Sequence, residues 1–128
     1  MNNFLELENE HLKMKVDTLF GGKIVEIVNK KNNVNWVWFD SDKHSEFKPI
    51  QFSDYDSQWI GGYEELFPND KIETMNDKIA PDHGELWPSK WDIVDKSKYS
   101  VDLTCKGYFS NSKVKKTISI DQNKVLIN

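Results

Sequence analysis

The sequence predicts an all-β protein, an antiparallel β-sandwich, on three observations. Apolar residues recur with a period of two over most of the 128 residues, which is typical of strands that bury one face. Short clusters of Asn, Gly, Asp and Ser interrupt these segments, as hairpin turns require. Helical spacing of apolar residues is scarce. We therefore expect a meander of antiparallel strands, with residues 1–128 forming a single domain.

Four strands are expected before residue 40. In one of them Leu12, Met14 and Val16 fall on the same face, because successive side chains of a strand point to opposite sides. Turn-forming residues separate the strands at Asn9-Glu10, at Gly21-Gly22 and in residues 29–33. The expected strands span residues 4–8, 11–16, 23–28 and 34–39.

Four more strands are expected near the end of the chain, at residues 91–94, 99–106, 114–120 and 124–128. The last one begins as a new apolar strand and stops without a turn or a polar tail. Such a strand leaves an edge with unpaired backbone groups. We expect a truncated chain or, as the alternative, a homodimer in which this exposed edge strand pairs with a second copy.

The composition limits the partners and the compartment. The formal charge is -4 and all 17 basic residues are lysine, whereas nucleic-acid-binding proteins concentrate positive charge and use arginine. We therefore expect no nucleic-acid partner, and we place Lys113, Lys115 and Lys116 on the wet face of a strand. Cys105, the one cysteine, alternates with core positions and is predicted to be buried. Without a signal segment or a long apolar run, a cytoplasmic protein with no membrane partner is expected.

Residues 40–90 have little periodicity and contain all four prolines. A long irregular segment inside a compact domain is usually functional, so we expect the site there, with a short helical turn near residues 63–66. Two blocks, residues 58–70 and 80–91, combine aromatic rings with carboxylates. Aromatic faces stack on the C–H surface of a sugar while carboxylates and an imidazole bond its hydroxyls, which predicts a hexose ligand. The predicted substrate-binding residues are Trp59, Gly62, Glu65, Phe67, Asp82, Glu85, Trp87 and Trp91.

For each aromatic residue the alternative is packing at the end of the sandwich, and for Gly61-Gly62 it is a tight turn alone. His83 is the predicted catalytic residue, because it lies between Asp82 and a glycine that permits close backbone approach. An imidazole can act as the acid, and a carboxylate as the base, that interconvert the two anomers of a sugar by opening its ring. That chemistry needs no cofactor. No second histidine and no cysteine accompany His83 at ligand spacing, so no metal site is expected.

The blocks WIGGYEELFPND and PDHGELWPSKW, together with the opening LENEHLKMKVDTLFGGKIVEIVNK, resemble the N-terminal half of the aldose 1-epimerase (galactose mutarotase-like) family. The resemblance covers essentially the whole chain and ends at KTISIDQNKVLIN. It implies a β-supersandwich, with the sugar in a groove on its concave sheet. It also implies that His83, which matches the histidine of the family's HG motif, lines the groove near the ring oxygen of the sugar.

The resemblance further implies an isomerase of carbohydrate metabolism. The family's second histidine and its glutamate base follow the matched region and are not found among these 128 residues. Lys90 is only a loose counterpart of the basic residue that some members carry shortly after HG. We therefore expect anomer interconversion from a full-length form, and weak binding with little or no catalysis from this chain. A non-catalytic carbohydrate-binding β-sandwich module and an inactive truncated fragment are the alternatives.

Overall fold

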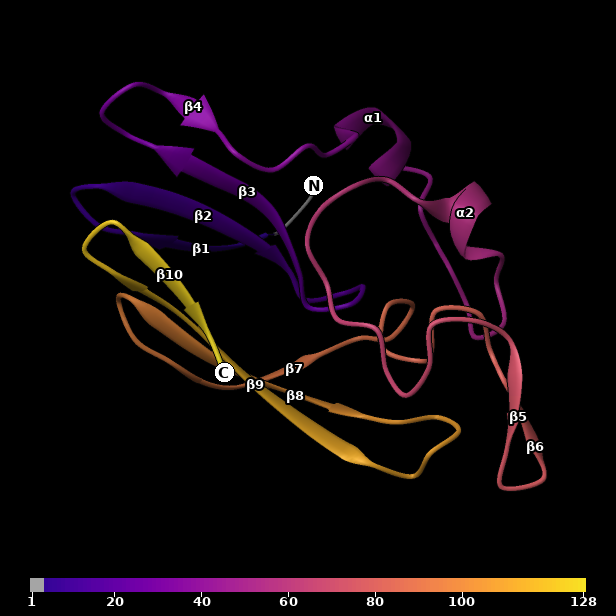
Figure 1. Cartoon of the computed structure of the whole chain (residues 1–128). Coiled ribbons are helices and arrows are strands. Elements are labelled where there is room, and N and C mark those ends of the chain that lie inside the picture. Colours follow the sequence, from indigo (N-terminus) through magenta and orange to yellow (C-terminus); the bar gives the residue numbers. More distant parts are fainter. Residues whose placement is uncertain (1–3) are drawn as a thin grey trace.

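Two antiparallel four-stranded sheets dominate the computed structural model, which describes residues 4–128 (Figure 1). The first sheet has the order β1-β2-β3-β4 and the second has the order β10-β9-β8-β7. The predicted all-β, antiparallel sandwich is confirmed. The strands of the first sheet are β1 (Leu5–Glu8), β2 (Leu12–Asp17), β3 (Lys23–Asn29) and β4 (Val34–Asn35). The strands of the second are β7 (Asp92–Lys96), β8 (Ser100–Lys106), β9 (Lys113–Asp121) and β10 (Lys124–Ile127).

The main hydrophobic core lies between the two sheets, because alternate side chains of both point inward. Met14 of β2, Val101 of β8 and Ile118 of β9 are completely buried. Cys105 belongs to the same cluster and is 3% exposed, so its predicted core position is confirmed. The remaining buried members are Leu5, Leu7, Leu12, Val16, Ile24, Leu86, Trp91, Leu103 and Ile120.

Regular antiparallel registers hold each sheet together. β1 pairs with β2 from Leu5 opposite Val16, and β8 pairs with β9 from Ser100 opposite Ser119. The turn between β2 and β3 uses Gly21-Gly22, which has φ values of 75° and 55°. This left-handed region favours glycine, which explains why a Gly-Gly pair forms the predicted turn.

The irregular segment lies beyond one end of the sheets (Figure 1). It contains two short helices and one hairpin that the periodicity did not predict: α1 (Ser41–His44), α2 (Tyr55–Gln58), β5 (Glu73–Met75) and β6 (Lys78–Ala80). Asp40 and Asp54 cap the two helices, since each side chain accepts a backbone N–H from the first turn. A second apolar cluster of Phe47, Ile60 and Trp87 packs this segment together.

Three predictions about local structure are wrong. The helical turn near residues 63–66 does not form, because Tyr63 instead pairs with Ile24 in an antiparallel bridge. The strand expected at residues 34–39 is shortened to Val34–Asn35, and Phe39 pairs with Gly61. Lys116 is not on the wet face of its strand, since it is 5% exposed. Within residues 4–128, no helix is long and apolar enough to cross a membrane.

Candidate functional site

The two blocks that the sequence singled out lie side by side. Phe67 and Gly84 form a parallel bridge, and the backbone N–H of Glu85 donates to the carbonyl of Phe67 at 2.7 Å. Asn69 Nδ2 donates to the carbonyl of Pro81 at 2.6 Å. A Cβ on Gly84 would overlap the Phe67 carbonyl, and φ there is 74°, so glycine is needed at the contact. The HG dipeptide is thus fixed against the FPN segment.

His83 lies at the surface of this junction. Its φ is 58°, a left-handed conformation that costs a non-glycine residue about 1–2 kcal/mol. The imidazole stacks on the ring of Tyr55, with centroids 3.8 Å apart and an interplanar angle of 7°. Nδ1 lies 3.0 Å from Asp82 Oδ1 but forms no hydrogen bond, because the contact is close without being aligned. The side chain is 26% exposed, so part of the ring can meet a ligand.

A buried charge network lies behind Tyr55. The Tyr55 hydroxyl donates to Glu64 Oε1 at 3.0 Å, and Lys23 Nζ is 3.3 Å from the same oxygen. The Glu64 and Lys23 side chains are 5% and 2% exposed. Burial raises the pKa of Glu64, and the nearby Lys23 charge opposes that shift. Burial, and then the Glu64 charge, raise the pKa of Tyr55, so the phenol remains a donor.

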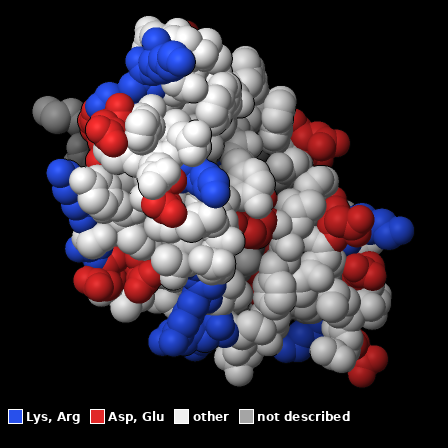
Figure 2. Space-filling model, turned by 60° about the vertical axis from the view of Figure 1, so that its left-hand side comes forward, with Lys and Arg blue, Asp and Glu red and all other residues white. Residues whose placement is uncertain are grey.

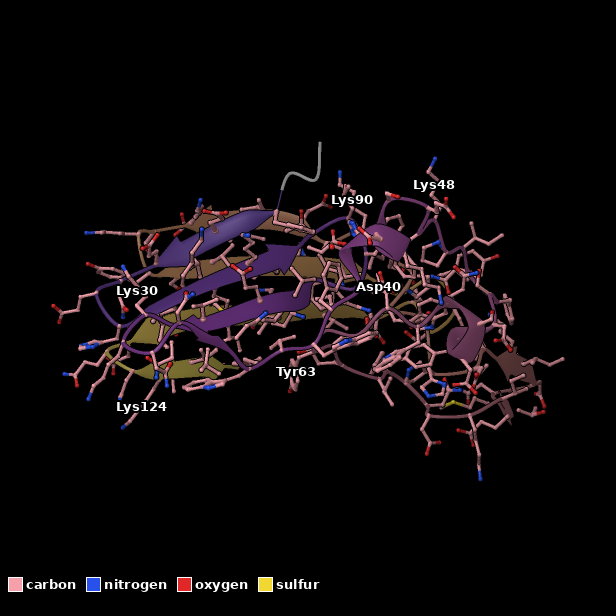
Figure 3. The ribbon with its side chains drawn as sticks, turned by 90° about the horizontal axis from the view of Figure 1, so that it is seen from above. Lys30, Asp40, Lys48, Tyr63, Lys90 and Lys124 are labelled. Carbon is pink, nitrogen blue, oxygen red and sulfur yellow. The ribbon has the colours of Figure 1, made fainter. Side chains whose placement is uncertain are left out.

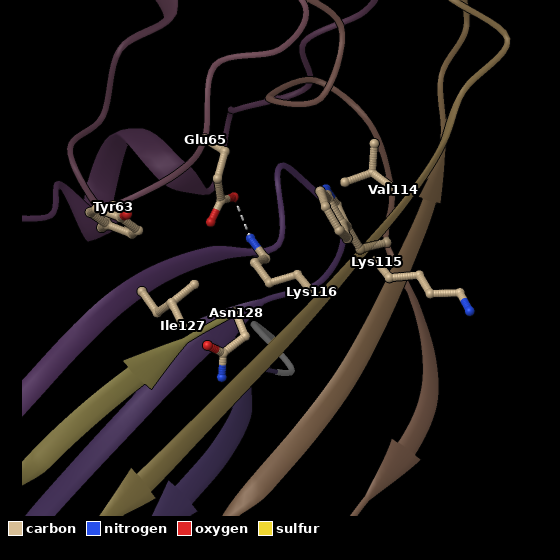
Figure 4. Close-up of a pocket in the computed structure, with 8 residues that line it drawn as sticks. Tyr63, Glu65, Val114, Lys115, Lys116, Ile127 and Asn128 are labelled. Carbon is tan, nitrogen blue, oxygen red and sulfur yellow. Dashed lines mark hydrogen bonds and ion pairs between the residues drawn. The ribbon is translucent and has the colours of Figure 1, made fainter.

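A separate cavity of about 320 Å³ lies over β9, and Figure 4 shows the residues that line it. Glu65 and Lys116 meet there, with Nζ 2.6 Å from Oε2, and Lys116 Nζ also donates to the Gly22 carbonyl at 2.9 Å. Burial lowers the pKa of Lys116, while Glu65 opposes that change. Glu65 Oε1 and Trp91 Nε1 are buried and have no hydrogen-bond partner among residues 4–128. The lining also includes Tyr63, Val114, Lys115, Ile127 and Asn128.

The two adjacent carboxylates connect these places, because Glu64 reaches Tyr55 beneath His83 and Glu65 reaches the cavity. Tyr63, which also lines the cavity, lies at the junction between the sheets and the irregular segment (Figure 3). Of the residues predicted from the sequence, Glu65 and Trp91 share the cavity, while Asp82 accompanies His83. The arrangement provides a partly exposed imidazole in one place and, among the described residues, an unpaired buried acceptor in the other.

Glu85 and Trp87 have packing roles that the sequence did not reveal. Glu85 is completely buried, and its carboxylate accepts hydrogen bonds from the backbone N–H groups of Phe109 and Ser110 and from the Ser110 hydroxyl. Trp87 is 2% exposed and donates through Nε1 to the Asp82 carbonyl at 3.3 Å. Both side chains therefore support the packing of the segment that carries His83, and their contact with a ligand stays a prediction.

The other predicted residues have mixed positions. Gly62 has φ 85°, and a Cβ there would lie 2.6 Å from the Lys23 side chain, so its role is the turn. Phe67 is half-buried against the main core. Trp59 is exposed and stacks on Trp38, with ring centroids 5.1 Å apart.

Comparison with solved structures identifies the fold. A galactose mutarotase-like protein from Lactobacillus casei ATCC 334 matches with a TM-score of 0.69 and 19% identity, over 98% of this chain and 42% of that one. A galactose mutarotase related enzyme from Lactobacillus acidophilus matches with a TM-score of 0.68 and 15% identity, over 95% of this chain and 40% of that one. The chain has a galactose mutarotase-like fold. An aldose epimerase homologue from C. elegans gives a TM-score of 0.61 and 19% identity, over 99% and 45% of the two chains.

The fold that the sequence motifs implied is therefore confirmed. The chain spans less than half the length of the mutarotase-like structures it matches. No family model matches the sequence, and neither does any curated protein.

Three polar residues of this mutarotase-like fold were not predicted as site residues: Lys23, Tyr55 and Lys116, the last of which was expected on a solvated face. Lys23 and Lys116 are buried charges within alternating strands, and a strand pattern does not distinguish them from solvated lysines. Tyr55 follows Asp54, whose capping potential at the start of α2 was the available signal. Their contacts depend on partners distant in the sequence.

Proposed function

We propose that this chain binds a hexose and forms the N-terminal portion of a longer aldose 1-epimerase-like domain that interconverts the α and β anomers of that sugar. The observation that carries the proposal is His83, a partly exposed imidazole held in a left-handed turn and stacked on Tyr55. The mutarotase-like fold supports it. Residues 1–128 are proposed to form one unit within that domain.

The reaction requires two groups and no net transfer of atoms. A base removes the proton from the anomeric hydroxyl, the bond between C1 and the ring oxygen breaks, and an acid protonates that oxygen. Rotation about the C1–C2 bond followed by the reverse steps gives the other anomer. We assign the acid role to His83, whose Nδ1 lies 3.0 Å from Asp82 Oδ1. The base is expected from the remainder of the longer domain.

We further propose that the cavity over β9 contributes to sugar binding. Glu65 Oε1 and Trp91 Nε1 are an acceptor and a donor with no partner in the part of the chain that the structure describes, and a sugar hydroxyl can satisfy either. The volume of about 320 Å³ is at the lower end of the range typical of small-molecule sites, which suits a single monosaccharide. Tyr63 offers an exposed aromatic face beside them.

A titration followed by NMR tests binding. The ¹⁵N-labelled chain is titrated with galactose and with glucose, and we expect shifts of the backbone amides of residues 62–66 and 82–84, with an affinity in the millimolar range. His83→Gln should weaken binding, whereas His11→Gln should not, because His11 is exposed at a turn in the first sheet. Unchanged spectra at the highest soluble sugar concentration would refute the proposal.

Polarimetry tests catalysis, with pure α-galactose or α-glucose in buffer, with this chain and with the full-length form. We expect acceleration from the full-length form, lost in its His83→Gln variant, and little from this chain alone. If the full-length form binds the sugar without accelerating anomer interconversion, the isomerase assignment is contradicted and the function is that of a carbohydrate-binding module.

The proposed setting is hexose metabolism in the cytoplasm, with no nucleic-acid and no membrane partner. In support, Cys105 is an unpaired buried thiol, as a reducing compartment allows. On the face drawn in Figure 2, lysine and acidic side chains are interspersed. A homodimer through the free edge of β10 is also proposed, since β10 pairs only with β9 among the described strands. Sedimentation equilibrium over a range of protein concentrations tests it, and a monomer at every concentration would contradict it.

A further inference from the structure

Tyr55 of α2 is the surface on which His83 lies. The two rings are nearly parallel, with an interplanar angle of 7° and centroids 3.8 Å apart. The edge of Tyr55 meets Trp87, with centroids 5.1 Å apart and an angle of 88°. Since Trp87 is buried in the second apolar cluster, it gives Tyr55 a fixed neighbour on the side of the core. Tyr55 therefore connects an exposed imidazole to a rigid interior.

The hydroxyl end of Tyr55 is fixed independently. It donates to Glu64 Oε1 at 3.0 Å, and the same carboxylate pairs with Lys23 of β3. Lys23 Nζ also donates to the Gly61 carbonyl at 3.0 Å. A buried charge pair of this kind is costly to break by removing one partner, so it holds the phenol at one position. The raised pKa of Tyr55 means that the hydroxyl keeps its proton at neutral pH.

The two nitrogens of His83 have different surroundings. Nδ1 lies 3.0 Å from Asp82 Oδ1 and is buried. No described protein atom forms a hydrogen bond with Nε2, which leaves it as the nitrogen that can meet a ligand. The backbone of His83 is held by the contact of Gly84 with Phe67, but its ring can still turn about its side-chain bonds. The Tyr55 stack is what fixes the plane of that ring.

We infer that Tyr55 is a positioning residue, which sets the plane of the His83 imidazole so that Nε2 faces the sugar, and that the Glu64–Lys23 pair fixes Tyr55 in turn. The identity of the ligand rests on the proposed function. The stacking of His83 on Tyr55 does not rest on the proposed function, and it can be measured without any sugar.

The test follows the imidazole protons of His83 by NMR. A ring stacked on a phenol experiences its ring current, so we expect the His83 protons upfield of those of His11, with contacts to the Tyr55 ring in a nuclear Overhauser spectrum. Tyr55→Phe retains the ring but loses the hydroxyl bond to Glu64 that fixes it, so it should keep only part of the upfield shift. Tyr55→Leu should move the His83 protons to values like those of His11. Tyr108→Leu, at an exposed tyrosine, is the matched control and should change neither the shift of the His83 protons nor their contacts to the Tyr55 ring.

The sugar titration separates this inference from the proposed function. Tyr55→Leu should reduce hexose affinity by about tenfold or more, since a misplaced group loses its contact. Tyr55→Phe should reduce it less, because the ring remains and only the hydroxyl bond to Glu64 is lost. An unshifted His83 in the wild-type chain would overturn the positioning role, as would a His83 shift that survives Tyr55→Leu. Should Tyr55→Leu fail to fold, the wild-type shift and the Tyr55→Phe variant still decide the question. If the stack is present and no hexose binds, the proposed function fails alone.

Discussion

The ammonium group of Lys116 lies 2.6 Å from Glu65 Oε2 and 4.4 Å from the centre of the Trp91 ring. A cation in this position contacts a carboxylate, an aromatic face and the backbone of the Gly21-Gly22 turn at once. Because Lys116 belongs to β9 and Gly21-Gly22 joins β2 to β3, the contact connects the two sheets. It also forms one wall of the cavity proposed for the sugar.

Lys116→Met is expected to lower the free energy of unfolding by about 2–3 kcal/mol. The substitution keeps the length of the side chain but leaves Glu65 and the turn carbonyls without their donor, and such losses are costly when the groups are buried. Denaturant unfolding measures the change. Lys115→Met, at the exposed neighbouring position of the same strand, should have little effect. Equal losses in the two variants would contradict a structural role for the Lys116 contacts.

Glu64 should make stability depend on pH in an unusual direction. Burial raises the folded-state pKa of Glu64 above the usual 4.5. At pH values between 4.5 and that folded-state pKa, the folded state therefore binds more protons than the unfolded state. The stability contributed by the protonated form is fully present below pH 4.5 and is lost as pH rises through the folded pKa. The free energy of unfolding of Glu64→Gln should therefore decrease less over that window than that of the wild type. Glu46→Gln, at an exposed residue, should follow the wild-type curve.

The left-handed conformation of His83 predicts a difference between two variants that both lack the imidazole. His83→Gly should be more stable than His83→Ala by about 1 kcal/mol, because glycine adopts a φ of 58° without the penalty of a Cβ. Thermal unfolding of the two proteins gives the comparison. Both variants should lose hexose binding to the same extent. A more stable alanine variant would show that the turn relaxes in solution.

Glu85→Gln is expected to destabilise the protein by about 2 kcal/mol without a direct effect on the ligand. Its carboxylate accepts hydrogen bonds from Phe109 and Ser110, and bonds to a charged acceptor are stronger than those to an amide. Denaturant unfolding reports the stability, and the NMR titration reports hexose affinity under conditions where the variant is folded. A Glu85→Gln variant with reduced hexose affinity and an unchanged free energy of unfolding would show that Glu85 contacts the ligand.

Some of this structure could be predicted because it depends on neighbours along the chain. The alternation of Leu12, Met14 and Val16 specifies a half-buried strand wherever its partner lies, since the period of a strand is a local property. The two blocks around Glu65 and His83 were selected for a similar reason, because each concentrates aromatic and acidic residues within a short stretch, and the structure places them side by side.

The features that the sequence did not predict depend on contacts with residues outside the local segment. Tyr63 failed to form the expected helical turn because Ile24 of β3 offered its backbone a partner. The burial of Lys116 against Glu65 and the hydrogen bonds of Glu85 with Ser110 involve groups far apart in sequence, and Tyr55 contacts Glu64 nine residues away, outside its own helix. By itself, the sequence determined most strands of the two sheets, their apolar inward faces and the residue types of the candidate site. Only the tertiary structure decided which polar groups meet and which are enclosed, because the free energy of a charge depends on its neighbours in space and on its distance from water.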